Sequence, residues 1–150
     1  MSISVDNILV ITPAVNGTLL APYSLGLPRL ICGSEVGWLP REFRINLSRD
    51  LCQRKYMSHY MRDYEWVLLM DSDVVVDSEC FEKLRSNAAI GKTACADTKP
   101  GEKSHVVCAC ALVHRTDYIK VDYLCKPTEC QCMKLPNPFY VEGAVGYERK

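Results

Sequence analysis

The chain has 150 residues, which is enough for one domain with an ordinary hydrophobic core. Hydrophobic residues make up 48% of it and charged residues 24%, which is typical of a soluble globular protein and excludes a disordered polyelectrolyte. Eighteen basic residues balance eighteen acidic ones, so the net charge gives no support for a nucleic-acid partner.

The start of the chain and the length of its apolar runs predict neither export nor a membrane span. Residues 1–7 lack a basic region followed by an apolar one, so no signal peptide is expected. The longest apolar run, Trp66 to Met70, is far too short to cross a bilayer. We therefore expect a cytoplasmic protein.

The first half of the chain predicts two strands and one helix. Ile8 to Ile11 is an apolar run ended by a Thr-Pro pair, which predicts a buried strand that opens into a loop. The segment 15–40 is rich in glycine and proline and is expected to be irregular, with a strand at Arg29 to Cys32. Asn46 is a good N-cap for a helix that continues to about Arg62.

The second half predicts three further strands and a second helix. Trp66 to Met70 has the length of a strand, and Ser78 is expected to cap a helix with an apolar inner face. Residues 94–104 read as a loop, whereas 106–113 and 139–147 read as strands. Strands that alternate with helices predict a single α/β domain over residues 1–150, with a mostly parallel sheet flanked by helices.

An acidic pair follows the most apolar of these strands. Ligands of open α/β sheets bind beyond the carboxyl ends of the strands, and Asp71-Ser72-Asp73 stands at such an end. In an extended segment, residues two apart project to the same side, so Asp71 and Asp73 can address one ligand. Two neighbouring carboxylates repel each other unless a cation neutralises them. Mg²⁺ or Mn²⁺, which prefer oxygen ligands and bridge to phosphates, are the expected occupants. The alternative is a pair of solvated turn residues before the helix.

The stretch 65–84 (EWVLLMDSDVVVDSECFEKL) resembles the nucleotide-sugar-binding signature of GT-A glycosyltransferases, in particular the inverting family 2. In that family an apolar strand ends in Asp-x-Asp and a helix follows. Residues 8–16 (ILVITPAVN) are similar to the family's first strand and nucleotide-cradling loop, and 48–50 (SRD) to its Ala-Arg-Asn. Residues 107–115 and 139–147 are similar to later strands, but only the Asp-x-Asp segment is specific.

The resemblance implies a GT-A-like fold, a nucleotide-sugar donor, a glycan, lipid or protein acceptor, and Mn²⁺ or Mg²⁺ as cofactor. A peripheral contact with a membrane is compatible with a lipid acceptor. The implied site residues are Glu129 as general base; Thr12, Pro13, Asn16, Glu35, Arg49 and Asp71 around the nucleotide; and Asp71, Asp73 and Glu148 on the metal. Glu35 and Glu148 stand where the family usually has another acid and a histidine, and the chain is short for the family.

Two other interpretations stay open. A nucleotidyltransferase uses a similar sheet with metal-binding carboxylates, but the chain has no glycine- and arginine-rich phosphate loop after its first strand. The second is a zinc-bound interaction module without catalysis. The chain has nine cysteines, and the candidate ligands would be Cys108, Cys110, Cys125, Cys130 and Cys132. No C-x-x-C occurs, so we favour small buried hydrophobic side chains as the role of the thiols, with disulfides also open.

Overall fold

The computed structural model describes residues 3–14, 21–33, 38–97, 110–124 and 135–146. Within them a six-stranded sheet has the order β2-β1-β3-β6-β5-β7, and β4 pairs with β8 in a second, two-stranded sheet. The strands are β1 (Ile8–Pro13), β2 (Arg29–Cys32), β3 (Trp66–Met70), β4 (Val74–Val76), β5 (Ala94–Asp97), β6 (Cys110–His114), β7 (Phe139–Glu142) and β8 (Ala144–Gly146). The helices are α1 (Arg41–His59), α2 (Ser78–Asn87) and α3 (Arg115–Tyr118), with a 3-10 turn at Val5–Asn7.

The large sheet is mostly parallel, as the sequence predicts. β1 runs parallel to both β2 and β3, and β7 runs parallel to β5. Of the described strands in this sheet, β6 has the opposite direction and runs antiparallel to its two neighbours, β3 and β5. The register places Ile8 opposite Trp66 and Ile11 opposite Leu69, so the carboxyl ends of β1 and β3 emerge at one edge of the sheet.

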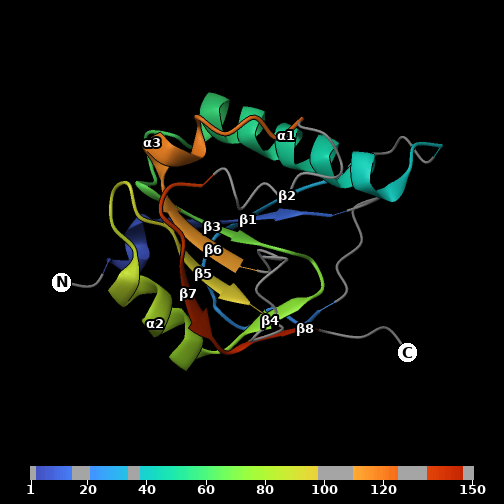
Figure 1. Ribbon diagram of the computed structural model, residues 1–150. Coiled ribbons are helices and arrows are strands. Elements are labelled where there is room, and N and C mark those ends of the chain that lie inside the picture. Colours follow the sequence, from blue (N-terminus) through green and yellow to red (C-terminus); the bar gives the residue numbers. More distant parts are fainter. Residues whose placement is uncertain (1–2, 15–20, 34–37, 98–109, 125–134, 147–150) are drawn as a thin grey trace.

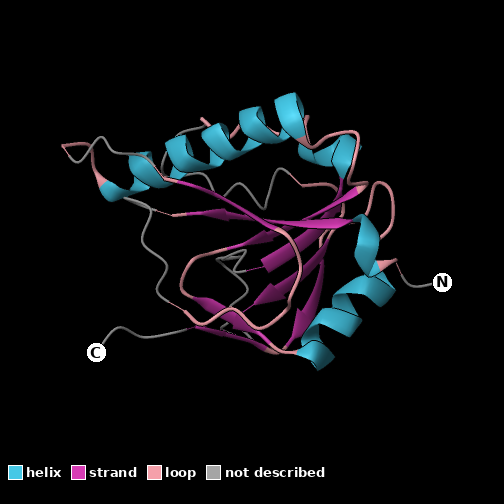
Figure 2. Ribbon diagram, turned by 180° about the vertical axis from the view of Figure 1, so that it is seen from behind, coloured by secondary structure: helices cyan, strands magenta, loops and turns pink. Residues whose placement is uncertain are grey.

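Both faces of the sheet are buried, which explains the continuous apolar runs in β1 and β3. Leu9 and Ile11 pack on the side of α1 and α3, whereas Ile8 and Val10 pack on the side of α2. Figures 1 and 2 show these helices on opposite sides of the sheet, which makes three layers. The alternation of neighbouring side chains along a strand thus supplies two separate cores.

The long helix begins earlier than its sequence suggests. α1 starts at Arg41 after Pro40, which makes no side-chain capping hydrogen bond. The prediction that Asn46 caps the helix is therefore wrong: Asn46 lies inside α1 and is 7% exposed. A good capping residue marks a favourable start, but packing against the sheet can extend a helix past it.

The second helix differs by one residue from the prediction. Asp77, not Ser78, is the N-cap of α2, and its carboxylate accepts a hydrogen bond of 2.7 Å from the backbone N–H of Cys80. The predicted inner face is confirmed, because Cys80, Phe81 and Leu84 are buried.

Two later segments correct the sequence analysis. Residues 94–97 form the buried strand β5 between β6 and β7, although they were expected in a loop. Residues 139–147 do not make one strand, because the chain turns at Gly143 (φ 123°) and continues as β8, which pairs with β4. A side chain at Gly143 would meet Cβ of Cys80 at 3.1 Å, so glycine also fits the close approach of this turn to α2. Within the described part of the chain, no helix combines the length and apolar character that crossing a membrane requires.

Candidate functional site

The acidic pair lies on the connection between the central strand and β4. Asp71 directly follows β3, Ser72 and Asp73 form a turn, and the chain then enters β4. Both carboxylate residues are half-buried. Ser72 and Asp73 are in a turn, so the alternation of an extended segment does not align Asp71 with Asp73 as predicted.

Asp71 is held by a cation from the long helix. The guanidinium of Arg49 in α1 lies 3.4 Å from Oδ1 of Asp71, and both side chains are about one quarter exposed (25% and 24%). Both residues were predicted from the sequence as site residues, and the fold brings them together across 22 positions of the chain. A half-buried carboxylate beside a second acid is stabilised by such a positive charge. The ion pair therefore gives Arg49 the role of orienting Asp71.

The end of β1 lies at the same edge of the sheet as this turn. Thr12 is fully buried, and its hydroxyl oxygen accepts a hydrogen bond of 2.8 Å from Nε of Arg29. Pro13 is half-buried and lies opposite Cys32 of β2. Since the side chain of Thr12 is buried, its hydroxyl at this edge holds the guanidinium of Arg29.

The segment 21–28, which precedes β2, lies against the acidic turn, and the sequence did not predict this contact. The backbone N–H of Ala21 donates to the carbonyl of Ser72 at 2.9 Å. The ring of Tyr23 lies 4.6 Å below the guanidinium of Arg29, and its hydroxyl donates to the carbonyl of Leu27 at 2.7 Å. Burial lowers the pKa of Arg29, and Tyr23 opposes that shift. In the sequence, only the position of Arg29 within a short strand pointed to this contact, because a half-buried cation needs a partner.

The donor set at this edge fits a hard cation only in part. Carboxylate oxygens from Asp71 and Asp73 suit Mg²⁺ or Mn²⁺, which commonly use one or two protein carboxylates and fill the other positions with water and substrate phosphates. Among the described residues, no group of three or more His, Cys, Asp or Glu side chains could hold a metal. Asn16, Glu35, Glu129 and Glu148, which complete the implied site, lie outside the described residues.

The cysteines that the structure describes are buried or half-buried thiols. Burial, followed by the nearby Cys80 and Asp71, raises the pKa of Cys110 well above its ordinary value. The other four cysteines of the zinc interpretation, Cys108, Cys125, Cys130 and Cys132, lie outside the described residues.

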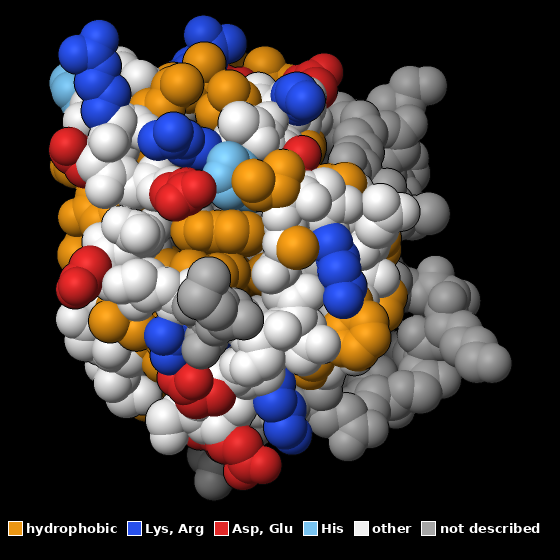
Figure 3. Space-filling model, turned by 90° about the vertical axis from the view of Figure 1, so that its left-hand side faces the viewer, with side chains coloured by type: hydrophobic (Ala, Val, Ile, Leu, Met, Phe, Trp, Pro, Cys, Tyr) orange, Lys and Arg blue, Asp and Glu red, His pale blue; other side chains and the backbone are white. Residues whose placement is uncertain are grey.

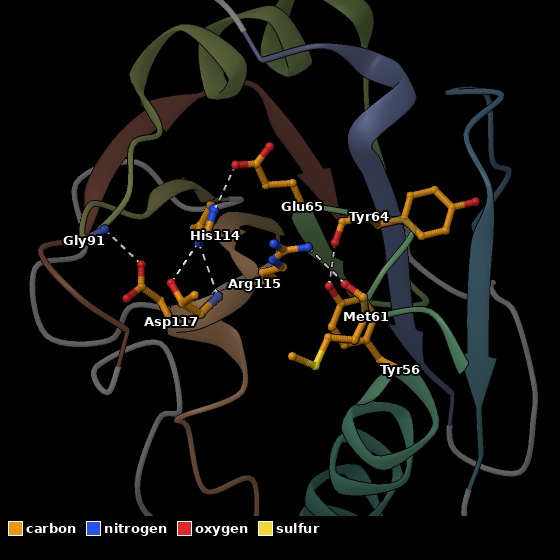
Figure 4. A network of polar contacts seen from close by, with 9 residues as sticks. Tyr56, Met61, Tyr64, Glu65, Gly91, His114, Arg115 and Asp117 are labelled. Atoms are coloured by element: carbon orange, nitrogen blue, oxygen red, sulfur yellow. Dashed lines mark hydrogen bonds and ion pairs between the residues drawn. The ribbon is translucent and has the colours of Figure 1, made fainter. Parts of the chain in front are cut away.

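A second polar cluster lies at the opposite end of β3 (Figure 4). Nε2 of His114 lies 3.2 Å from Oε1 of Glu65. Nδ1 of the same ring accepts a hydrogen bond of 3.3 Å from the backbone N–H of Thr116. Arg115 donates to the carbonyl of Met61 at 3.2 Å. Figure 3 shows this side of the molecule, where histidine, acidic and basic side chains are interspersed with apolar ones. His114 caps α3 and ties β6 to the start of β3, so the cluster is explained by local structure.

No protein-family model matches the sequence. No curated protein is similar to it at a significant level. The fold, in contrast, is similar to solved structures. One is the crystal structure of a glycosyltransferase involved in the glycosylation of the major capsid of PBCV-1, with a TM-score of 0.50 and 14% identity over 74% of this chain. This chain spans 61% of the length of that protein. Another is the protein A197 from STIV, with a TM-score of 0.52 and 14% identity, covering 92% of this chain and 83% of that one. At such identities the similarity establishes a shared α/β fold compatible with the GT-A-like class.

Proposed function

We propose that this protein transfers a sugar from a nucleoside-diphosphate sugar to an acceptor hydroxyl, with Mn²⁺ or Mg²⁺ held by Asp71 and Asp73. The observation that carries the proposal is the placement of two half-buried carboxylates at the edge where β1 and β3 end side by side. Open α/β sheets bind their ligands at this edge. The similarity of the fold to that of a glycosyltransferase also supports the proposal, although only as a similarity of fold.

The described residues at this edge would have different roles in the reaction. Asp71 and Asp73 would hold the cation, and a bound cation offsets the negative charge that develops on a departing nucleoside diphosphate. Arg49 orients Asp71 through their ion pair. Thr12 and Pro13, at the end of β1, together with the adjacent backbone would cradle the nucleotide.

The remaining roles rest on residues outside the described part of the chain. Glu129 would act as general base and take the proton of the acceptor hydroxyl, so that in-line attack inverts the anomeric carbon. Asn16 and Glu35 would contact the nucleotide, and Glu148 would complete the metal ligands. The acceptor would be a hydroxyl of a glycan, a lipid or a protein.

Calorimetric titration tests donor and metal binding together. UDP-, GDP- and dTDP-sugars would be titrated into the wild type and into Asp73→Ala, with and without Mn²⁺. We expect binding that requires Mn²⁺ and is lost in Asp73→Ala. Asp63→Ala is the matched control, because Asp63 is an exposed acid in the turn that precedes β3, at the far end of that strand. Equal binding to the wild type and Asp73→Ala, or no binding to any donor, would overturn the proposal.

A second variant separates catalysis from binding. Glu129→Ala is expected to keep donor binding in the same titration and to lose transfer to the acceptor, because the base acts only in the chemical step. Intact transfer by a correctly folded Glu129→Ala protein would remove Glu129 from the mechanism and leave the donor site unaffected.

A further inference from the structure

The long helix α1 carries large apolar side chains on the side that faces solvent. Its inner side packs on the sheet through the buried Cys52 and Tyr56. Phe43, Leu47 and Leu51 follow one another at intervals of four residues, so they share one face of the helix. Phe43 and Leu51 are exposed, and Leu47 is half-buried. This face is therefore apolar although it is not covered by the sheet.

An exposed tryptophan adjoins this face at the start of the helix. Trp38 lies three residues before α1 and is 83% exposed, the highest exposed fraction among the large apolar side chains that the structure describes. Figures 1 and 2 show the first turn of α1 beyond the end of the sheet. Arg49 of α1 contacts Asp71, so this half of the helix lies at the edge that carries the acidic turn. A tryptophan ring, with a large apolar body and one polar N–H, suits the boundary between lipid and water.

Positive charge accompanies the exposed apolar side chains. Arg54 and Lys55 follow Leu51 by three and four positions, so they lie on the same side of α1, and both are exposed. Arg54 remains 70% exposed although it pairs with Asp50. Residues 38–59 contain five Arg or Lys and two Asp or Glu, whereas the whole chain has a net charge of zero. The positive charge is thus concentrated where the apolar side chains reach solvent.

This combination favours an anionic lipid surface over a second copy of the chain. Two copies joined through this face would bring two positively charged surfaces together, and like charges repel. Anionic phospholipid headgroups attract the same cations, while the apolar side chains enter the interfacial layer. We propose that one surface binds reversibly to an anionic phospholipid membrane, and we call it the outer surface of α1: Trp38, Phe43, Leu47, Leu51, Arg54 and Lys55. Such binding would hold the edge with the acidic turn close to the lipid headgroups.

Tryptophan fluorescence of the full chain tests this surface directly. The chain has two tryptophans, and Trp66 is buried (8% exposed), so a change on addition of vesicles reports on Trp38. Vesicles of equal parts phosphatidylcholine and phosphatidylserine should move the emission to shorter wavelengths and sediment together with the protein. Vesicles of phosphatidylcholine alone should bind much more weakly, and added salt should weaken binding to the mixed vesicles because it screens the attraction.

Two pairs of variants separate the apolar and the charged contributions. Trp38→Ala and Lys55→Glu should each lower the affinity for the mixed vesicles by about tenfold in co-sedimentation. Ile90→Ala and Lys83→Glu are the matched controls and should bind as the wild type does. Ile90 is an exposed apolar side chain in the turn after α2, and Lys83 is an exposed cation on α2, which covers the opposite face of the sheet.

Several results would overturn the proposal. These are no binding to the mixed vesicles, equal binding to both kinds of vesicle, or wild-type affinity in Trp38→Ala. A wild-type dimer in sedimentation velocity that Trp38→Ala abolishes, without vesicle binding, would assign the surface to a second copy instead. The wild-type fluorescence decides the matter even where a variant fails to fold. Neither a sugar donor nor a metal is present in these experiments, so their outcome is independent of the proposed sugar transfer.

Discussion

Replacing Arg49 by methionine should weaken the fold slightly and strengthen metal binding. Nη2 of Arg49 lies 3.4 Å from Oδ1 of Asp71. At an effective dielectric constant of about 20, that separation corresponds to an attraction of roughly 5 kcal/mol. The cost of removing both groups from water and of ordering them offsets most of this, so a pair about one quarter exposed contributes about 1 kcal/mol. Arg49→Met should therefore lower the free energy of unfolding in EDTA by about 1 kcal/mol.

The effect on metal affinity should have the opposite sign. In the wild type, a cation bound to Asp71 competes with and repels the guanidinium of Arg49. Without that guanidinium, the same 1 kcal/mol becomes available to the metal, which corresponds to a dissociation constant for Mn²⁺ lower by about fivefold. Calorimetric titration with Mn²⁺ measures the affinity, and urea unfolding in EDTA measures the stability.

Arg54→Met is the matched control, because Arg54 pairs with Asp50 at 2.8 Å one turn further along α1 and is 70% exposed. It should leave the affinity for Mn²⁺ unchanged. An Arg49→Met protein that folds but binds Mn²⁺ as the wild type does, or less tightly, would refute the placement of the metal on Asp71.

Three further predictions concern the two helices and the thiol of Cys32. Asp77→Ala should destabilise the protein by about 1 kcal/mol in urea unfolding, because it removes the cap of α2, while Ser78→Ala should have a clearly smaller effect. Leu84→Ala should lower the free energy of unfolding by about 3 kcal/mol, since Leu84 is fully buried and a cavity would remain. Alkylation of Cys32 should be half-maximal near pH 7, because its pKa is lowered to about 7 and only the thiolate reacts. The rate should rise as the pH increases through that value. In Cys52→Ala the midpoint should move towards the ordinary value of 9.0, and an unmoved midpoint would show that Cys52 does not set the pKa.

Sequence reasoning worked best where one local pattern dominated. Trp66–Met70 and Arg29–Cys32 have the predicted bounds, because apolar strands between turn-forming residues are specified by their own composition. β5 was missed since Ala94, Cys95 and Ala96 are small and carry no β-branched side chain. They form a strand because they fit between β6 and β7, which is a property of the neighbours and not of the segment.

The sequence by itself determined the α/β class, the acidic pair at the end of the central strand, and the inner face of α2. These features depend on residues close together in the chain, whose periodicity and order are visible without the fold. Only the tertiary structure decided that Arg49 meets Asp71, that Ala21 lies beside Ser72, and that the thiol of Cys52 in α1 lies against the carbonyl of Thr12 in β1. Such contacts join segments separated by many residues, and they arise from the parallel pairing of β1 with β2 and β3 under α1. No local pattern encodes that pairing, because it depends on how all the strands bury their two faces together.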